Sequence, residues 1–193
     1  MIGVYMFLAE GFEETEAIAT LDVLRRGGVP VKTVSVTDEP VVAGAHGIGV
    51  RTDLPWKDFL PLADHTGTDP MDMMIFPGGM PGTKNLAENE VLMDMMKKHW
   101  DKGGAVAAIC AAPGLVVSQL PDIDEMDVTC YDGFEENLKA KGCNCTGEPA
   151  VVDANLITGR GPGCAIDFGL AILSYLRGEE YAEAVRAGLL LPY

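Results

Sequence analysis

Short β-prone apolar runs alternate along the chain with longer segments whose apolar residues recur at helical spacing. The first pattern is typical of strands buried on both faces of a sheet, and it predicts strands at residues 2–8, 29–36, 72–76 and 105–109. The second predicts helices at residues 12–27, 83–86, 90–102, 165–176 and 179–188. Because a helix-length crossover between successive strands gives a parallel pair, the pattern predicts a mainly parallel sheet between helical layers, an α/β sandwich.

The segments between these elements show weaker hydrophobic periodicity. Val41–Val42 with residues 48–51 predict a hairpin or two edge strands, and residues 150–152 with 156–158 predict a hairpin. Residues 53–71 contain three prolines and predict a surface insertion with one helical turn. The first helix is expected to bury a core stripe of Ile18, Leu21, Val23 and Leu24. No repeat or linker divides the chain, so we expect one domain over residues 1–193.

The composition of the chain disfavours several classes of function. A formal charge of −15 over 193 residues disfavours nucleic-acid binding, because phosphate groups would be repelled. The opening apolar run has no basic region before it and is too short to cross a bilayer. The cysteine count of five is odd, which argues against a disulfide framework and for reduced thiols. We therefore expect a cytoplasmic protein with no targeting segment.

Metal binding is not expected from the cysteines. Cys143 and Cys145 are too closely spaced for a usual zinc knuckle and have no histidine nearby, so they are predicted to be loop thiols. The three histidines are separated along the chain: His46 in a turn, His65 in the insertion, and His99 on the predicted surface of a helix.

The strand at residues 105–109 ends at Cys110, and Ala111-Ala112-Pro113-Gly114 follows. This order predicts a sharp strand-to-helix turn, in which proline is tolerated in the first helical turn and small residues let the helix lie close to the sheet. Such a turn raises its central side chain above the sheet, and a helix N-terminus beside the sulfur favours the thiolate. The alternative is a core cysteine that fills space as an alanine would.

Other turns should gather around Cys110, because ligands bind at the carboxyl ends of parallel strands. Residues 77–79 and 159–163 form two such turns, and the N–H groups of Gly79 and Ala111 could make an oxyanion hole. The turn after the first strand carries Glu13, Glu14 and Glu16. Glu13 and Glu14 are expected to reach solvent, whereas Glu16 could face Cys110 and share one proton with it, which would leave a sulfur of low pKa.

Four segments occur in the order of a known family: Gly11-Phe12-Glu13-Glu14-Thr15-Glu16, Pro77-Gly78-Gly79, the stretch from Ala107 to Pro113, and Gly159-Arg160-Gly161-Pro162-Gly163. Together they resemble the ThiJ/PfpI family of the class I glutamine-amidotransferase-like superfamily, and most of all the branch of the Parkinsonism-associated protein. The resemblance implies a flavodoxin-like three-layer sandwich, a homodimer, and an oxidisable Cys110 nucleophile. Glu16 would be its protonated partner, and Gly79 and Ala111 the backbone donors.

The sequence also departs from that family. In the peptidase branch a histidine directly follows the cysteine, where this chain has Ala111; the closest branch has a histidine where this chain has Tyr131. His46 falls where the family often contributes a pocket residue from the dimer partner, but a polar turn residue explains it equally well. Arg160 could bind an anion at the pocket or form a structural ion pair.

The family includes proteins with glyoxalase, protein-deglycase, peptidase, chaperone and oxidative-stress-sensing activities, so the fold does not determine the reaction. We expect cofactor-free, metal-free chemistry on reactive aldehydes or glycated substrates in stress defence, with Cys110 as nucleophile. The alternative is a redox sensor or chaperone that uses Cys110 without turnover. Peptide or amide hydrolysis is disfavoured, because no histidine is predicted beside Cys110.

Overall fold

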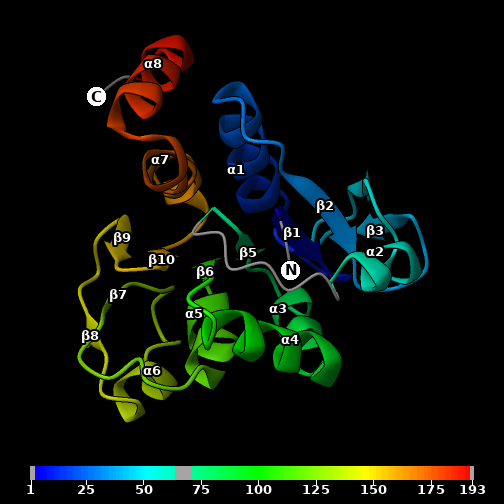
Figure 1. Cartoon of the computed structure of the whole chain (residues 1–193), viewed down its shortest axis with the longest axis horizontal. Coiled ribbons are helices and arrows are strands. Elements are labelled where there is room, and N and C mark those ends of the chain that lie inside the picture. The colour runs from blue at the N-terminus through cyan, green and yellow to red at the C-terminus, as the bar shows by residue number, and fades with distance from the viewer. Residues whose placement is uncertain (1–2, 64–70, 192–193) are drawn as a thin grey trace.

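The computed structural model describes residues 3–63 and 71–191. A six-stranded sheet in the order β2-β1-β5-β6-β10-β9 forms its centre (Figure 1). The strands are β1 (Val4–Leu8), β2 (Lys32–Ser35), β5 (Met73–Phe76), β6 (Ala105–Ile109), β9 (Ala150–Asp153) and β10 (Leu156–Gly159). The first five strands in this order pair in parallel, and only β9 is antiparallel to its neighbour. The expected flavodoxin-like, mainly parallel sheet is confirmed.

Helices cover both faces of this sheet, with α1, α7 and α8 on one side and α2 to α5 on the other (Figure 1). The helices are α1 (Glu14–Arg26), α2 (Trp56–Ala63), α3 (Gly82–Ala87), α4 (Glu90–Trp100), α5 (Ala112–Leu115), α6 (Glu136–Ala140), α7 (Ala165–Arg177) and α8 (Glu179–Leu189). Alternate residues of β1 serve the two layers: Met6 and Leu8 pack against the α1 and α7 side, whereas Tyr5 and Phe7 pack on the opposite face.

Two small sheets lie outside the central one. β3 (Val41–Ala43) and β4 (Gly49–Arg51) form an antiparallel hairpin, as the sequence predicts. β7 (Asp127–Val128) and β8 (Asn144–Cys145) pair in parallel. The hairpin of β9 and β10 also forms as expected, and both strands belong to the central sheet, where β10 places Gly159 beside the end of β6.

Two expectations about apolar residues are wrong. Ile18 is 41% exposed, because α1 directs Ala17, Thr20 and Leu24 into the core and Ile18 lies on a different side of the helix. The insertion contains the full helix α2, and its Phe59 is completely buried against Tyr5 and Phe7. This part of the insertion is therefore core structure, whereas residues 64–70, with His65, lie outside the described residues.

His99 and Cys143 are also placed differently from expectation. His99 is buried rather than on the helix surface, and its Nε2 lies 3.0 Å from the carbonyl oxygen of Ala105. Burial lowers the pKa of this imidazole, so the core holds it neutral. Cys143 is buried too, with its sulfur 3.1 Å from the Ile123 carbonyl, and burial raises its pKa to about 11. Cys143 is thus a core thiol, and Cys145 is half-buried in β8.

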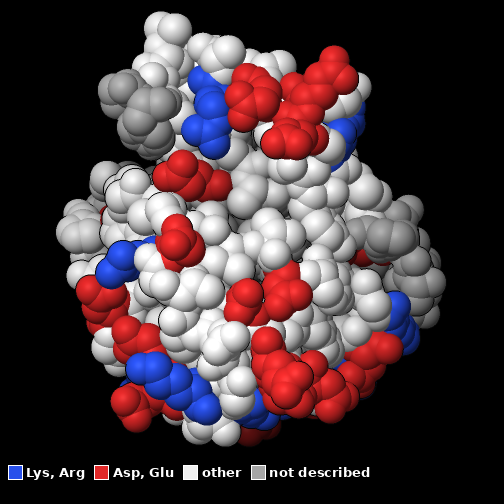
Figure 2. All heavy atoms as spheres, turned by 90° about the vertical axis from the view of Figure 1, so that its left-hand side faces the viewer, with Lys and Arg blue, Asp and Glu red and all other residues white. Residues whose placement is uncertain are grey.

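The surface reflects the acidic composition. On the face shown in Figure 2, acidic side chains outnumber basic ones, and uncharged surface separates the groups. Within residues 3–63 and 71–191, no helix combines the length and apolar character that crossing a bilayer requires.

Candidate active site

Cys110 stands at the turn between β6 and α5, in a backbone conformation that residues other than glycine rarely adopt. Its φ is 66°, a left-handed value that costs a residue with a Cβ about 1–2 kcal/mol. Hydrogen bonds on both sides hold it there: its N–H donates to Gly159 O at 2.9 Å, and its carbonyl accepts from Tyr131 N–H at 2.8 Å. Pro113 occupies the first turn of α5. The turn expected from the sequence is present, and its strain is held by hydrogen bonds to the end of β10 and to the loop after β7.

Main-chain donors surround the sulfur. The N–H groups of Gly79 and Ala111 both hydrogen-bond to it. Gly79 has a φ of 90°, and a Cβ there would lie 2.3 Å from Glu13 N, so only glycine fits where the loop approaches the start of α1. Cys110 is buried, with 8% of the residue exposed. The structure thus brings the two predicted backbone donors together at Cys110.

Glu16 is completely buried, and its side chain meets the Cys110 thiol. Its Oε2 accepts a hydrogen bond from Gly78 N–H at 2.8 Å. No N–H or O–H group of the described residues bonds to the other oxygen, Oε1, which is also buried. A proton on Oε1 would therefore be free to face the sulfur. Sequence reasoning identified Glu16 but missed that Gly78 orients it.

Burial dominates the electrostatics of this pair. It raises the pKa of Glu16 to about 7, although the Cys110 thiol and the Gly78 N–H counteract it. Burial also raises the pKa of the Cys110 thiol, the charge of Glu16 adds to this, and the N–H groups of Ala111 and Gly79 oppose it. The expectation that the turn lowers the thiol pKa is wrong, because α5 is only one turn long and desolvation outweighs its dipole. The two groups can readily carry only one negative charge between them.

Glu14 was predicted to reach solvent but is buried, and its carboxylate links the β3–β4 hairpin to α1 through hydrogen bonds. Its Oε1 accepts from His46 N–H at 2.7 Å, and its Oε2 lies 2.8 Å from His46 Nδ1. Burial alone would raise the Glu14 pKa, but the bonds from His46 and Ile48 outweigh it and hold that pKa at about 2. Gly44 leaves room for this carboxylate, since a Cβ there would be 2.4 Å from Glu14 Cδ. No local sequence pattern indicates that Glu14 and His46 form this contact.

Among the described residues, Glu13, Glu14 and His46 each place one potential metal ligand within 4.8 Å of the others. Each of the three already has a protein partner, since Glu13 Oε2 caps α1 by accepting from Glu16 N–H at 2.7 Å and Glu14 binds His46. Internal pairing therefore explains this group.

Tyr131 and Arg160 line the outer side of the turn. The Tyr131 ring is 48% exposed and packs beside Gly161 and edge-on to Phe134. Arg160 is exposed, and its guanidinium pairs with Asp132 at 2.9 Å, which is the structural ion pair that the sequence left open. His46, whose side chain is 71% exposed, contacts Glu14.

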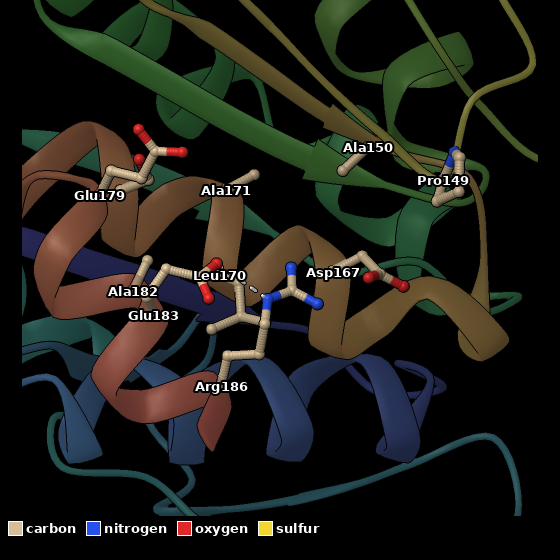
Figure 3. A pocket seen from close by; sticks show the side chains of 10 residues that line it. Pro149, Ala150, Asp167, Leu170, Ala171, Glu179, Ala182, Glu183 and Arg186 are labelled. Atoms are coloured by element: carbon tan, nitrogen blue, oxygen red, sulfur yellow. Dashed lines mark ion pairs between the residues drawn. The ribbon is translucent and has the colours of Figure 1, made fainter. Parts of the chain in front are cut away.

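A cavity of about 330 Å³ lies between β9, α7 and α8 (Figure 3). Its lining includes Asp167, Glu179 and the ion pair of Arg186 with Glu183, at 3.2 Å. None of the residues around the Cys110 sulfur belongs to that lining. The cavity is thus separate from the candidate active site.

Gly78→Ala is expected to disrupt the pair and destabilise the fold by about 2 kcal/mol, as overpacking does. The new Cβ would lie 2.6 Å from both Cys110 Cβ and Glu16 Oε2. Thermal unfolding and the rate of Cys110 alkylation measure the effect. Gly163→Ala is the matched control, because nothing lies within 4 Å of a Cβ at that exposed position. Equal behaviour of the two variants would contradict the described packing.

Comparisons with known proteins identify the family of this chain. The model of the DJ-1/PfpI family matches residues 3–175. Protein dj-1beta of Drosophila melanogaster is 32% identical over 97% of this chain and 96% of its own length. The "Glutathione-independent glyoxalase DJR-1.2" of Caenorhabditis elegans is 34% identical over 94% and 92%. Protein DJ-1 homolog A of Arabidopsis thaliana is 35% identical over 95% of this chain, which spans about half of that relative, 45%.

Solved structures show the same relationship. "Toxoplasma gondii DJ-1, oxidized" superimposes with a TM-score of 0.87 at 29% identity over 100% of both chains. Drosophila melanogaster DJ-1beta superimposes with a TM-score of 0.86 at 30% identity over 98% of both. With a family model that matches most of its length and full-length relatives above 30% identity, this chain belongs to the DJ-1/PfpI family.

Proposed function

We propose that this protein converts small reactive aldehydes in stress defence, as a glyoxalase or deglycase that needs neither metal nor organic cofactor. One observation carries the proposal: a strained cysteine whose sulfur meets two main-chain N–H groups and a buried carboxyl group. This arrangement supplies a nucleophile, donors for a developing oxyanion and a proton carrier at one point.

We infer that the negative charge lies on the sulfur when Glu16 holds the proton, although burial raises the pKa of the Cys110 thiol. Two N–H groups, from Gly79 and Ala111, face the sulfur, whereas Gly78 N–H and the Cys110 thiol itself donate to Glu16. When Glu16 holds the shared proton on Oε1, its charge no longer raises the pKa of the Cys110 thiol. We therefore propose a Cys110 thiolate beside a protonated Glu16 as the reactive state.

The proposed reaction balances without an external oxidant. The thiolate attacks the aldehyde carbon of methylglyoxal, and the resulting oxyanion takes the Glu16 proton to give a hemithioacetal. Glu16 then removes the proton from that carbon to give an enediol and delivers it to the neighbouring ketone carbon, while the hydroxyl proton moves from the first oxygen to the second. The second carbon is thereby reduced to an alcohol as the first is oxidised to a thioester. Water cleaves the thioester, which releases lactate and restores the thiol. Gly79 and Ala111 N–H groups would stabilise the oxyanions.

The relative in Caenorhabditis elegans that is named a glutathione-independent glyoxalase supports this choice of substrate class. Peptide hydrolysis is less well supported, because Ala111 follows the cysteine, His46 pairs with Glu14, and His99 is buried against Ala105. The test is lactate formation from methylglyoxal without glutathione. We expect repeated turnover, and lactate formation at the uncatalysed rate would contradict the proposal.

A second candidate function is redox sensing, which the solved "Toxoplasma gondii DJ-1, oxidized" favours by analogy. The N–H groups of Gly79 and Ala111 and a protonated Glu16 would bind the oxygens of a sulfinate at Cys110. Mild peroxide followed by intact-mass and peptide analysis should place two oxygens at Cys110 before any other cysteine. Oxidation spread evenly over the five free cysteines would argue against a sensor.

We also propose a cytoplasmic homodimer. The five free cysteines suit a reducing compartment. Ile18 lies one turn after Glu14 on α1, and Ile48 N–H bonds to the carboxylate of Glu14. Two exposed isoleucines therefore lie on either side of the contact between Glu14 and the β3–β4 hairpin. Burying such apolar surface favours self-association. Sedimentation should give a dimer for the wild type and a shift towards monomer for Ile18→Asp; a monomeric wild type would contradict this assembly.

A further inference from the structure

The two edges of the central sheet differ in how their main-chain groups are used. At the β2 edge, Ser35 N–H donates to Leu54 O at 2.9 Å, and Leu54 N–H donates to Thr33 O at 3.0 Å. The segment just before α2 therefore occupies that edge. β9 forms the other edge, and a strand whose outer groups are free can pair with another chain.

The pairing of β9 with β10 determines which groups of β9 face outwards. Arg160 N–H donates to Pro149 O at 3.0 Å, so every second residue from Pro149 onwards directs its main-chain groups towards β10. Ala150 and Val152 therefore direct their N–H and C=O groups away from β10. These groups have no hydrogen-bond partner among the described residues, and Val152 is 48% exposed.

The same register places the side chains of Ala150 and Val152 on the α7 and α8 side of the sheet. Val152 pairs with Ile157, which packs in the core on that side. Ala150 lines the cavity of about 330 Å³ shown in Figure 3, together with the buried side chains of Leu170 and Ala182. A strand added along β9 would direct every second side chain to this side of the sheet, where the cavity lies.

The charge of the cavity indicates which side chain fits there. Asp167 and Glu179 line it and have neither a hydrogen bond nor an ion pair among the described residues. Arg186 is the one basic residue of the lining, and Glu183 pairs with it at 3.2 Å. A basic side chain would pack its apolar stem on the buried part of the lining and bring its charge to the unpaired carboxylates.

A second copy of this chain fits the same surface poorly. Two copies paired along β9 would bring their unpaired carboxylates together, and each chain carries a formal charge of −15. On the side of the molecule where β9 lies, acidic side chains outnumber basic ones (Figure 2). The charge therefore favours a basic partner.

We propose that β9 binds an extended basic peptide as an additional, antiparallel strand. The peptide main chain bonds to Ala150 and Val152, and its lysine or arginine side chains, at alternate positions, enter the cavity and pair with Asp167. Antiparallel pairing is the more stable arrangement per residue, and it is the one in which β9 already pairs with β10. None of the residues around the Cys110 sulfur lines this cavity, so the proposal does not rest on the function proposed for Cys110.

The probe is acetyl-Lys-Val-Lys-Val-Lys-amide, titrated into the isotope-labelled full chain at physiological salt while the amide signals are followed by NMR. We expect saturable shifts at Ala150 and Val152. In an antiparallel strand, the residues whose side chains face the cavity are also those whose N–H groups face β9. Methylation of the main-chain nitrogens of two lysines should therefore weaken binding about tenfold, whereas methylation at both valines should change it less than about twofold.

Two variants test the surface from the side of the protein. Val152→Pro removes an N–H that takes no part in the bonds to β10, a change that edge strands tolerate, and should weaken binding about fivefold. Asp167→Asn should weaken it about threefold. Glu39→Gln is the matched control: it removes one exposed charge in the loop after β2, at the opposite edge of the sheet, and should leave the affinity unchanged.

Equal affinity of the two methylated peptides, equal affinity of Asp167→Asn and Glu39→Gln, or shifts that do not saturate would overturn the proposal. If the signals of Ala150 and Val152 change with protein concentration alone, a second copy occupies the edge and the proposal is wrong. These arms decide the question even if Val152→Pro does not fold.

Discussion

Cys110→Ser is expected to reduce the formation of lactate from methylglyoxal by at least about 10³-fold, because it removes the group that forms the covalent intermediate. Serine retains a side chain of similar shape at the strained turn, so Gly79 and Ala111 should keep their positions. A hydroxyl group ionises far less readily than a thiol, and one buried carboxyl group does not compensate for that. The measurement is lactate produced under excess methylglyoxal, with thermal unfolding to verify the fold.

Cys164→Ser provides the control for this experiment. Cys164 is a half-buried free cysteine at the end of the short 3₁₀ helix Pro162–Cys164, just before α7, and the N–H groups of Gly79 and Ala111 bond to the Cys110 sulfur instead. Its replacement should leave the lactate rate within about twofold of the wild type. A Cys110→Ser variant that retains the wild-type rate would show that another group performs the reaction.

Glu16→Gln is expected to stabilise the protein at pH 8 by up to about 3 kcal/mol, with little effect near pH 4.5. The pKa of Glu16 is raised to about 7 from an ordinary value of 4.5, so the folded state holds this proton more tightly than the unfolded state. The wild type therefore loses stability as pH rises from about 4.5 to 7 and loses no more from this group above that. Glutamine keeps an acceptor for Gly78 N–H without the charge.

Denaturant unfolding at several pH values measures this difference. Glu148→Gln is a suitable control, because Glu148 is exposed and its replacement should shift the curve little at any pH. If the wild type and Glu16→Gln differ by a constant amount from pH 4.5 to 8, burial does not raise the pKa of this carboxyl group. The same variant should also lose lactate formation, since it cannot carry the proton.

The main elements of the fold could be predicted because their signals are local. Five-residue apolar runs such as Ala105–Ile109 and the small residues after Cys110 specify a strand, a turn and a helix from near neighbours alone. The position of Gly79 and Ala111 beside the sulfur follows from the parallel order of β1, β5 and β6, whose carboxyl ends meet.

The errors concern properties that depend on residues distant in the chain. Glu14 pairs with His46, and Phe59 packs on Tyr5 and Phe7. No hydrophobic periodicity in the sequence indicates these contacts. His99 was expected on a helix surface, but the packing of α4 against β6 buries it. The pKa of Cys110 depends on how completely the surrounding loops remove water, which the turn alone does not determine.

The pH dependence of Cys110 alkylation measures whether Cys110 and Glu16 share one proton. The wild-type rate should rise with an apparent pKa near 7 and then level off, because the pair gains its single charge there. The profile of Glu16→Gln should differ from this. A wild-type rate that rises only through the ordinary thiol range, about 8.5, with the same profile in Glu16→Gln, would contradict a shared proton.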